Sequence, residues 1–157
     1  HIKDKKINYI KGNTKDISTI LNDKIEEYLP IFKNKRISIV KNITEGIAIR
    51  WSEKDFVRVI DNLISNAYYY SKESSVFEVN IKNEERIQIE FISSPININD
   101  IEKDKIFNKG VRGSLSFNNN NYGKGYGLYL CRLLLSSIGG SVSIDIINEN
   151  VKFTIML

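Results

Sequence analysis

The stretch Gly123-Lys124-Gly125-Tyr126-Gly127-Leu128 places three glycines at two-residue spacing directly before the apolar, helix-forming run 128–135. Glycine lets the backbone approach a ligand closely. The first N–H groups of a helix, together with the helix dipole, attract an anion. The stretch therefore predicts a phosphate-binding turn that leads into a helix from Tyr126 to Ser137. The alternative is a glycine-rich turn that binds nothing, so a second element has to support the phosphate interpretation.

That second element lies earlier in the chain, in Asp61-Asn62-Leu63-Ile64-Ser65-Asn66-Ala67. Apolar residues recur here at helical spacing from Phe56 to Tyr70 and predict an amphipathic helix. Asn62 and Asn66 are four residues apart and therefore share one face of it, although asparagine is a poor residue inside helices. We interpret the two amides as neutral oxygen ligands for a hydrated Mg²⁺ ion that also holds substrate phosphates. A solvated helix face in an asparagine-rich protein is the alternative.

Composition limits the class of protein. The 157 residues are 41% hydrophobic, enough for one domain with a real core. The net charge of +4 is mild and spread along the chain, which gives nucleic-acid binding little support. The only cysteine, Cys131, excludes a disulfide framework and is expected to be a small buried apolar residue. No apolar run approaches the roughly 20 residues of a membrane span. The chain begins with His1, and we expect it to be a fragment of a longer protein.

Hydrophobic periodicity predicts the other elements. A helix is expected from Ile17 to Lys33, capped by Asp16 and bent or ended near Pro30. An edge strand is expected at Lys6–Ile10, and two strands, Arg36–Val40 and Ile47–Trp51, are expected around a turn at Glu45-Gly46. Strands Val76–Lys82 and Arg86–Ile92 are expected to form a hairpin. After a turn at Gly139-Gly140, the last two strands are expected at Ser141–Ile147 and Val151–Met156.

The order of these elements predicts an α/β fold, with helices layered on one face of a mixed, largely antiparallel sheet. The long polar segment between Pro95 and Lys124 is expected to be functional or mobile, because long loops inside compact domains usually are.

Three stretches of this chain resemble motifs of one family, the ATP-binding catalytic domains of bacterial sensor histidine kinases. Residues 62–71 resemble the asparagine box, 106–113 the phenylalanine box and 123–128 the second glycine box. The resemblance covers nearly the whole chain, and three boxes in the right order are more specific than any one. It implies a single Bergerat-type domain over residues 1–157. This is a two-layer sandwich with three helices on one face of a mixed, mostly antiparallel sheet and a mobile ATP lid at about 95–124.

The resemblance also implies roles for individual residues. Asn66 would be the Mg²⁺ ligand, with Asn62 as its partner at the metal–phosphate site. From the lid, Lys109 and Arg112 would meet the phosphates, and Phe107 would anchor that lid by packing. The glycine box would supply the remaining nucleotide contacts, with backbone N–H groups of Gly125 and Gly127 around the phosphates. The expected nucleotide-binding residues are Asn62, Asn66, Tyr69, Tyr70, Ser93, Pro95, Lys109, Arg112, Gly123, Lys124, Gly125, Tyr126, Gly127 and Leu128.

The chain departs from the family pattern at two places. Ser93 stands where the first glycine box normally has an Asp that accepts a hydrogen bond from the adenine amino group, and Pro95 and Asn97 stand where glycines are expected. Losing a charge-assisted hydrogen bond costs about 1.5–3 kcal/mol. Tyr69 occupies a position where a basic residue often touches phosphate, for which Lys72 or Lys124 would have to substitute.

The implied function is transfer of the ATP γ-phosphoryl group to a histidine on a separate dimerisation domain, because His1 lies outside any acid-flanked histidine motif. The implied partners are ATP, Mg²⁺, the dimerisation helices of a homodimeric kinase and a response regulator, with no nucleic acid. We expect a cytoplasmic domain of a membrane-bound kinase that reaches the membrane only through an N-terminal region outside this chain. The alternatives are a degenerate docking module with weak or no ATP binding and another ATPase of this fold, such as an anti-sigma-factor serine kinase or a heat-shock chaperone domain.

Overall fold

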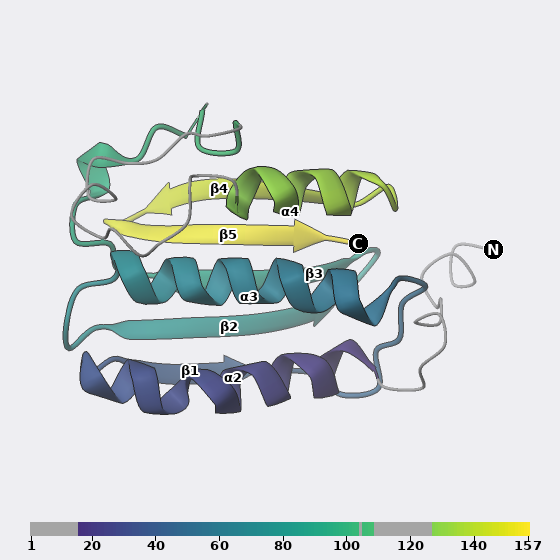
Figure 1. Ribbon diagram of the computed structural model, residues 1–157, viewed down its shortest axis with the longest axis horizontal. Coiled ribbons are helices and arrows are strands. Elements are labelled where there is room, and N and C mark those ends of the chain that lie inside the picture. Colours follow the sequence, from purple (N-terminus) through teal and green to yellow (C-terminus); the bar gives the residue numbers. More distant parts are fainter. Residues whose placement is uncertain (1–15, 104, 109–126) are drawn as a thin grey trace.

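The computed structural model describes residues 16–103, 105–108 and 127–157, and these form two layers (Figure 1). Helices α2, α3 and α4 lie together on one face of a five-stranded sheet. The elements are α2 (Ile17–Asn34), β1 (Ser38–Asn42), α3 (Glu53–Tyr70), β2 (Val76–Asn83), β3 (Ile87–Ser93), the 3₁₀ turn η1 (Ile98–Asp100), α4 (Gly127–Ser136), β4 (Ser141–Ile147) and β5 (Asn150–Met156). The expected fold class is confirmed.

The sheet is mixed, in the order β1-β2-β3-β5-β4. Only β1 and β2 pair in parallel, and the other three pairings are antiparallel. The register places Val79, Phe91 and Phe153 side by side across the three central strands. All three are buried, because alternate residues of these strands face the helix layer. The hairpin expected from strands Val76–Lys82 and Arg86–Ile92 is confirmed as β2 and β3.

Side-chain caps begin the two long helices. The Asp16 carboxylate accepts a hydrogen bond from the Thr19 N–H at 2.8 Å, and the Ser52 hydroxyl accepts one from the Asp55 N–H at 3.3 Å. Each cap satisfies an N–H group that has no partner within its helix. The helix expected from Ile17 to Lys33 is confirmed as α2, and Pro30 lies inside it without ending it.

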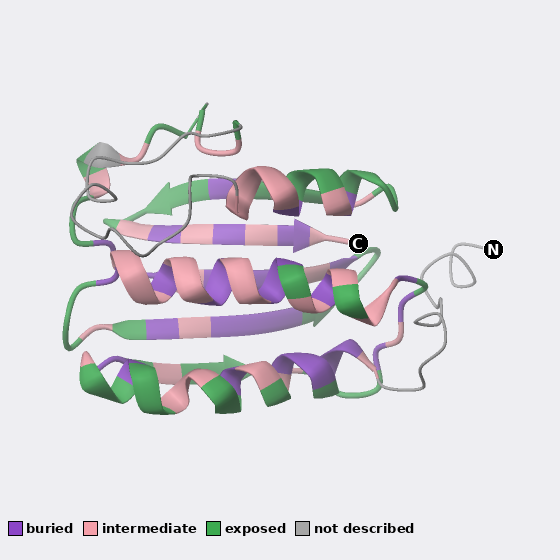
Figure 2. Cartoon of the chain, viewed as in Figure 1, coloured by how far each residue is buried: buried purple, intermediate pink, exposed green. Residues whose placement is uncertain are grey.

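The core lies between the two layers (Figure 2). Phe32 of α2 stacks on Phe77 of β2 with ring centroids 5.3 Å apart, and Phe77 stacks in turn on Phe91 of β3 at 6.3 Å. Full burial of each such side chain stabilises the fold by about 1.5–3 kcal/mol. Phe32 also packs edge-on against Tyr68 of α3, with ring centroids 5.6 Å apart. The same aromatic cluster therefore holds α2 against the sheet and against α3, the helix that carries the asparagine pair.

One expected strand was wrong. Residues Ile47–Trp51 form no strand, although Ile47, Ile49 and Trp51 are buried as the alternation suggested. The Ile47 carbonyl accepts a hydrogen bond from the Ile17 N–H at 2.9 Å, so the segment contacts the start of α2 rather than a neighbouring strand. Alternation here reflects burial against the starts of α2 and α3, where Trp51 packs edge-on against Phe56, rather than pairing in a sheet. The expected strand at Lys6–Ile10 lies outside the described residues.

Candidate nucleotide site

Helix α3 brings Asn62 and Asn66 onto one side, one turn apart, as the sequence predicted. Its apolar residues, including Phe56, Val59 and Leu63, are buried against the sheet and the neighbouring helices. Asn62 and Asn66 are half-buried beside this stripe. The burial of the apolar stripe therefore sets the direction in which the two amides point.

The start of α4 lies directly against Asn62. Helix α4 begins at Gly127, and a Cβ atom placed on this glycine would lie 3.0 Å from Asn62 Oδ1 and 3.4 Å from Asn62 Cγ. A contact of 3.0 Å is tight, so the Asn62 side chain would have to shift by a few tenths of an ångström to admit a Cβ atom. The structure thus joins the asparagine helix and the end of the glycine motif, two segments far apart in the sequence.

Cys131, one turn further along α4, strengthens this contact. Its thiol lies 3.7 Å from the Val59 carbonyl oxygen and within hydrogen-bonding reach of Asn62, and the residue is fully buried. Burial raises the pKa of the Cys131 thiol from 9.0 to about 12, although the hydrogen bond from Asn62 opposes this shift. The expected structural role of this cysteine is supported, since a neutral buried thiol is a poor nucleophile.

We expect the Cys131 thiol to resist alkylation in the folded protein. With a pKa of about 12 instead of 9.0, the thiolate fraction at pH 8 is about a thousandfold smaller, and the site is closed to the reagent. Iodoacetamide labelling at pH 8, carried out in buffer and in urea and followed by mass spectrometry, measures the difference in labelling rate between the folded and unfolded chain. Since the folded-state pKa is raised, the stability linked to this thiol is present below pH 9 and is lost as the pH rises toward 12. Native labelling as fast as labelling in urea would contradict the burial of Cys131.

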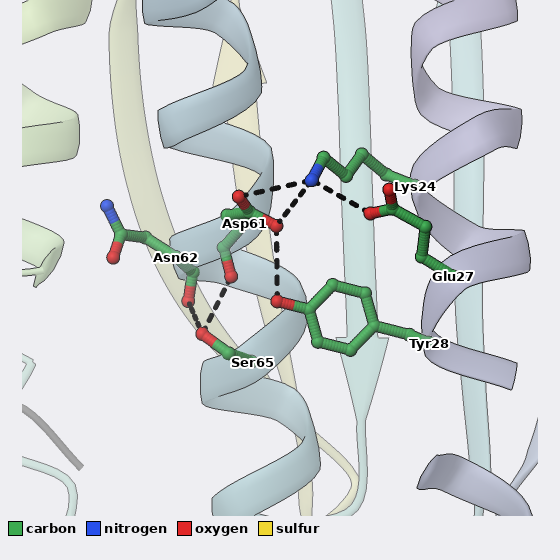
Figure 3. Close-up of polar contacts among 6 residues, drawn as sticks. All are labelled: Lys24, Glu27, Tyr28, Asp61, Asn62 and Ser65. Atoms are coloured by element: carbon green, nitrogen blue, oxygen red, sulfur yellow. Dashed lines mark hydrogen bonds and ion pairs between the residues drawn. The ribbon is translucent and has the colours of Figure 1, made fainter. Parts of the chain in front are cut away.

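The opposite side of α3 is held by α2 through a charged cluster (Figure 3). The Asp61 carboxylate lies 3.2 Å from the Lys24 ammonium and accepts a hydrogen bond from the Tyr28 hydroxyl at 3.1 Å. Lys24 also lies 2.9 Å from Glu27. Burial, followed by the charge of Asp61 and its hydrogen bond, raises the pKa of Tyr28, so that hydroxyl remains a donor at neutral pH. The cluster restrains rotation of α3 about its axis, and Figure 3 shows Asn62 extending from the other side of that helix.

Sequence reasoning missed this cluster. The amphipathic pattern of the second helix gave Asp61 no role. A usable signal was present, since Lys24 and Tyr28 are four residues apart and therefore lie on one face of α2. Only the packing of α2 against α3 identifies Asp61 as their partner.

The C-terminal end of α3 meets the segment that follows β3. The Ile96 N–H donates to the Tyr70 carbonyl and the Lys72 N–H donates to the Ser94 carbonyl, both at 2.8 Å. Between these two hydrogen bonds, Ser71 and Pro95 form an antiparallel bridge. Ser93 and Pro95, two of the expected nucleotide-binding residues, are both buried. These hydrogen bonds place them at the C-terminal end of the helix that carries the asparagines.

Phe107 packs edge-on against Phe153 of β5, with ring centroids 6.1 Å apart. The packing expected of this aromatic residue is confirmed. Its role as the anchor of a lid remains a prediction, because most of that segment lies outside the described residues. The expected site residues Lys109, Arg112, Gly123, Lys124, Gly125 and Tyr126 also lie outside the described residues, so their roles remain predictions. Leu128 lies in the first turn of α4 and packs against the core.

Comparison with known proteins supports this arrangement. The sequence profile of a family described as "Histidine kinase-, DNA gyrase B-, and HSP90-like ATPase" matches residues 52–157. The adaptive-response sensory kinase SasA of Rippkaea orientalis is 27% identical over 132 residues, which are 82% of this chain and 33% of the relative. The sensor protein VanSC of Enterococcus gallinarum is 25% identical over 148 residues, 94% of this chain and 41% of the relative. The chain thus spans well under half the length of these relatives.

Solved structures show the same fold. The nucleotide-free catalytic domain of the histidine kinase ThkA superposes with a TM-score of 0.76 at 17% identity, over 91% of this chain and 94% of that one. Full-length ShkA, solved in complex with AMPPNP, gives 0.73 at 17% identity, over 94% of this chain and 31% of that one. The resemblance stated from the three boxes is therefore confirmed. In the described part of the chain, no helix combines the length and apolar character needed to cross a bilayer.

Proposed function

This chain belongs to the family of histidine kinase-, DNA gyrase B- and HSP90-like ATPases, and from this premise we propose that it is the catalytic, ATP-binding domain of a sensor histidine kinase. The observation that carries the proposal is the contact between Asn62 and Gly127. It brings the asparagine-bearing helix α3 and the N-terminal end of α4 to one place. Neutral oxygen ligands and a helix start are the groups that a metal-bound triphosphate needs.

The residues fit a magnesium-bound triphosphate. Asn62 and Asn66 offer amide oxygens, and the missing Cβ at Gly127 lets the α4 backbone lie against Asn62. Asn66, with Asn62 as its partner, would hold Mg²⁺, which neutralises phosphate charge when it is bound. The N–H groups at the start of α4 would orient the phosphates. Lys109 and Arg112 would supply positive charge from the lid.

The chemistry that this arrangement supports is phosphoryl transfer, in which positioning and charge neutralisation do most of the catalysis. We infer that the acceptor is a histidine on the dimerisation helices of the same kinase, which acts as a homodimer and passes the group on to a response regulator. The full-length kinase would be membrane-bound, with this domain in the cytoplasm. The names of the relatives, which are sensor kinases, support this assignment.

Calorimetry with a non-hydrolysable ATP analogue and Mg²⁺ tests the proposal. Saturable binding to the 157-residue chain, followed by transfer from ATP to an added histidine-bearing dimerisation domain, is the expected result. The absence of both binding heat and a thermal shift at millimolar nucleotide would overturn the proposal and favour a docking module.

A further inference from the structure

Ser71, at the end of α3, has a buried hydroxyl that lacks a hydrogen-bond partner. The residue is 1% exposed, and its Oγ is one of two buried side-chain polar atoms without a partner in the described part of the chain. Proteins rarely leave a buried hydroxyl unpaired, and an exception needs an explanation such as an absent ligand. The position of Ser71 indicates which ligand could provide the partner.

A second hydroxyl, that of Ser93, lies on the same face as Ser71. Ser71 is directly opposite Pro95 in the antiparallel bridge, and Ser93 precedes Pro95 by two residues. Residues directly opposite one another, and alternate residues of one strand, point to the same side. Burial follows this alternation through Phe91, Ser93 and Pro95. The Ser94 hydroxyl, by contrast, donates to Asn150 at 2.8 Å from the other side.

These hydroxyls lie at the right place for the base of the proposed nucleotide. Ser71 follows Asn66 by roughly 7 Å of helix axis, at about 1.5 Å per residue. Asn62, which contacts the start of α4, lies one helical turn before Asn66, so it is further from Ser71 along the helix. A nucleotide whose phosphates are held at Asn62, Asn66 and Gly127 therefore extends its base toward Ser71 and Ser93. This step rests on the proposed function.

The chemistry of the two hydroxyls sets the expected base preference. A hydroxyl both donates and accepts hydrogen bonds, whereas an ionised carboxylate only accepts. The 6-amino group of adenine is a donor and the 6-oxo group of guanine is an acceptor. A carboxylate therefore selects the 6-amino base, while a rotatable hydroxyl adapts to either. We propose that the Ser71–Ser93 hydroxyl pair makes this domain a binder of both 6-amino and 6-oxo purine nucleoside triphosphates.

Displacement of a fluorescent nucleotide by ATP and by ITP, both with Mg²⁺, tests this inference, because ITP carries a 6-oxo base without the 2-amino group of guanine. We expect the two dissociation constants of the natural chain to agree within about threefold. Ser93→Asp is expected to tighten the binding of ATP and weaken the binding of ITP, so that the ratio of their dissociation constants changes by more than about tenfold. Ser94→Ala is the matched control, since that hydroxyl points to Asn150, and it should leave the ratio unchanged.

The outcomes separate this inference from the proposed function. If the natural chain binds ATP at least tenfold more tightly than ITP, the inference is overturned and the proposed function stands. Failure of both nucleotides to bind would overturn the proposed function itself. The comparison in the natural chain needs no variant, so it decides the question even if Ser93→Asp does not fold. An unchanged ATP to ITP ratio in a folded Ser93→Asp protein would also contradict the assignment of Ser93.

Discussion

Replacing Gly127 by valine is expected to remove most of the nucleotide affinity of this domain. The Cβ of any side chain at this position meets Asn62 Oδ1 at 3.0 Å, and the two γ-methyl groups of valine add further overlap. Either Asn62 moves away from the phosphate site or the start of α4 separates from α3. Overpacking of this kind costs about 1–3 kcal/mol, which corresponds to roughly 5- to 150-fold weaker binding if it falls on the bound state.

The measurement for Gly127→Val is calorimetric titration with a non-hydrolysable ATP analogue and Mg²⁺, with thermal melting to confirm folding. Helix propensity does not account for a loss, because valine is a better helix former than glycine. Ser136→Val is the matched control, since it places the same side chain at an exposed position near the other end of α4. If Gly127→Val binds as tightly as the natural chain, the start of α4 does not contact the phosphates.

Replacing Asn66 by alanine is expected to remove the part of the ATP affinity that depends on magnesium. The amide oxygen proposed as the metal ligand is lost, and a contact to a charged partner is worth about 1.5–3 kcal/mol. Binding of Mg-ATP should weaken by roughly ten- to a hundredfold. Binding of ATP in the presence of EDTA should change much less, because the phosphates and base retain their other contacts.

Titrations with and without Mg²⁺ separate these two effects for Asn66→Ala. Asn34→Ala, an exposed change near the end of α2, controls for removal of an asparagine from a helix. Equal losses in the two titrations would show that Asn66 supports the site through packing or hydrogen bonds and does not bind the metal.

Local patterns in the sequence identified most of the framework. The Asp16 cap was predicted because a helix start needs a side-chain acceptor, and the strands of the β2–β3 hairpin were predicted from their alternation. The alternation at Ile47–Trp51 was misleading, because burial against the starts of two helices produces the same pattern as a strand. Periodicity reports which residues are buried and does not report what covers them.

By itself, the sequence determined the fold class, the helix that carries Asn62 and Asn66, and the glycine-led start of α4. Each of these follows from residues close together in the chain. Only the tertiary structure decided which distant groups meet: Gly127 against Asn62, Asp61 with Lys24 and Tyr28, and Ser71 beside Pro95. The physical reason is that helix and strand periods set the direction of each side chain, whereas packing of whole elements sets its neighbours.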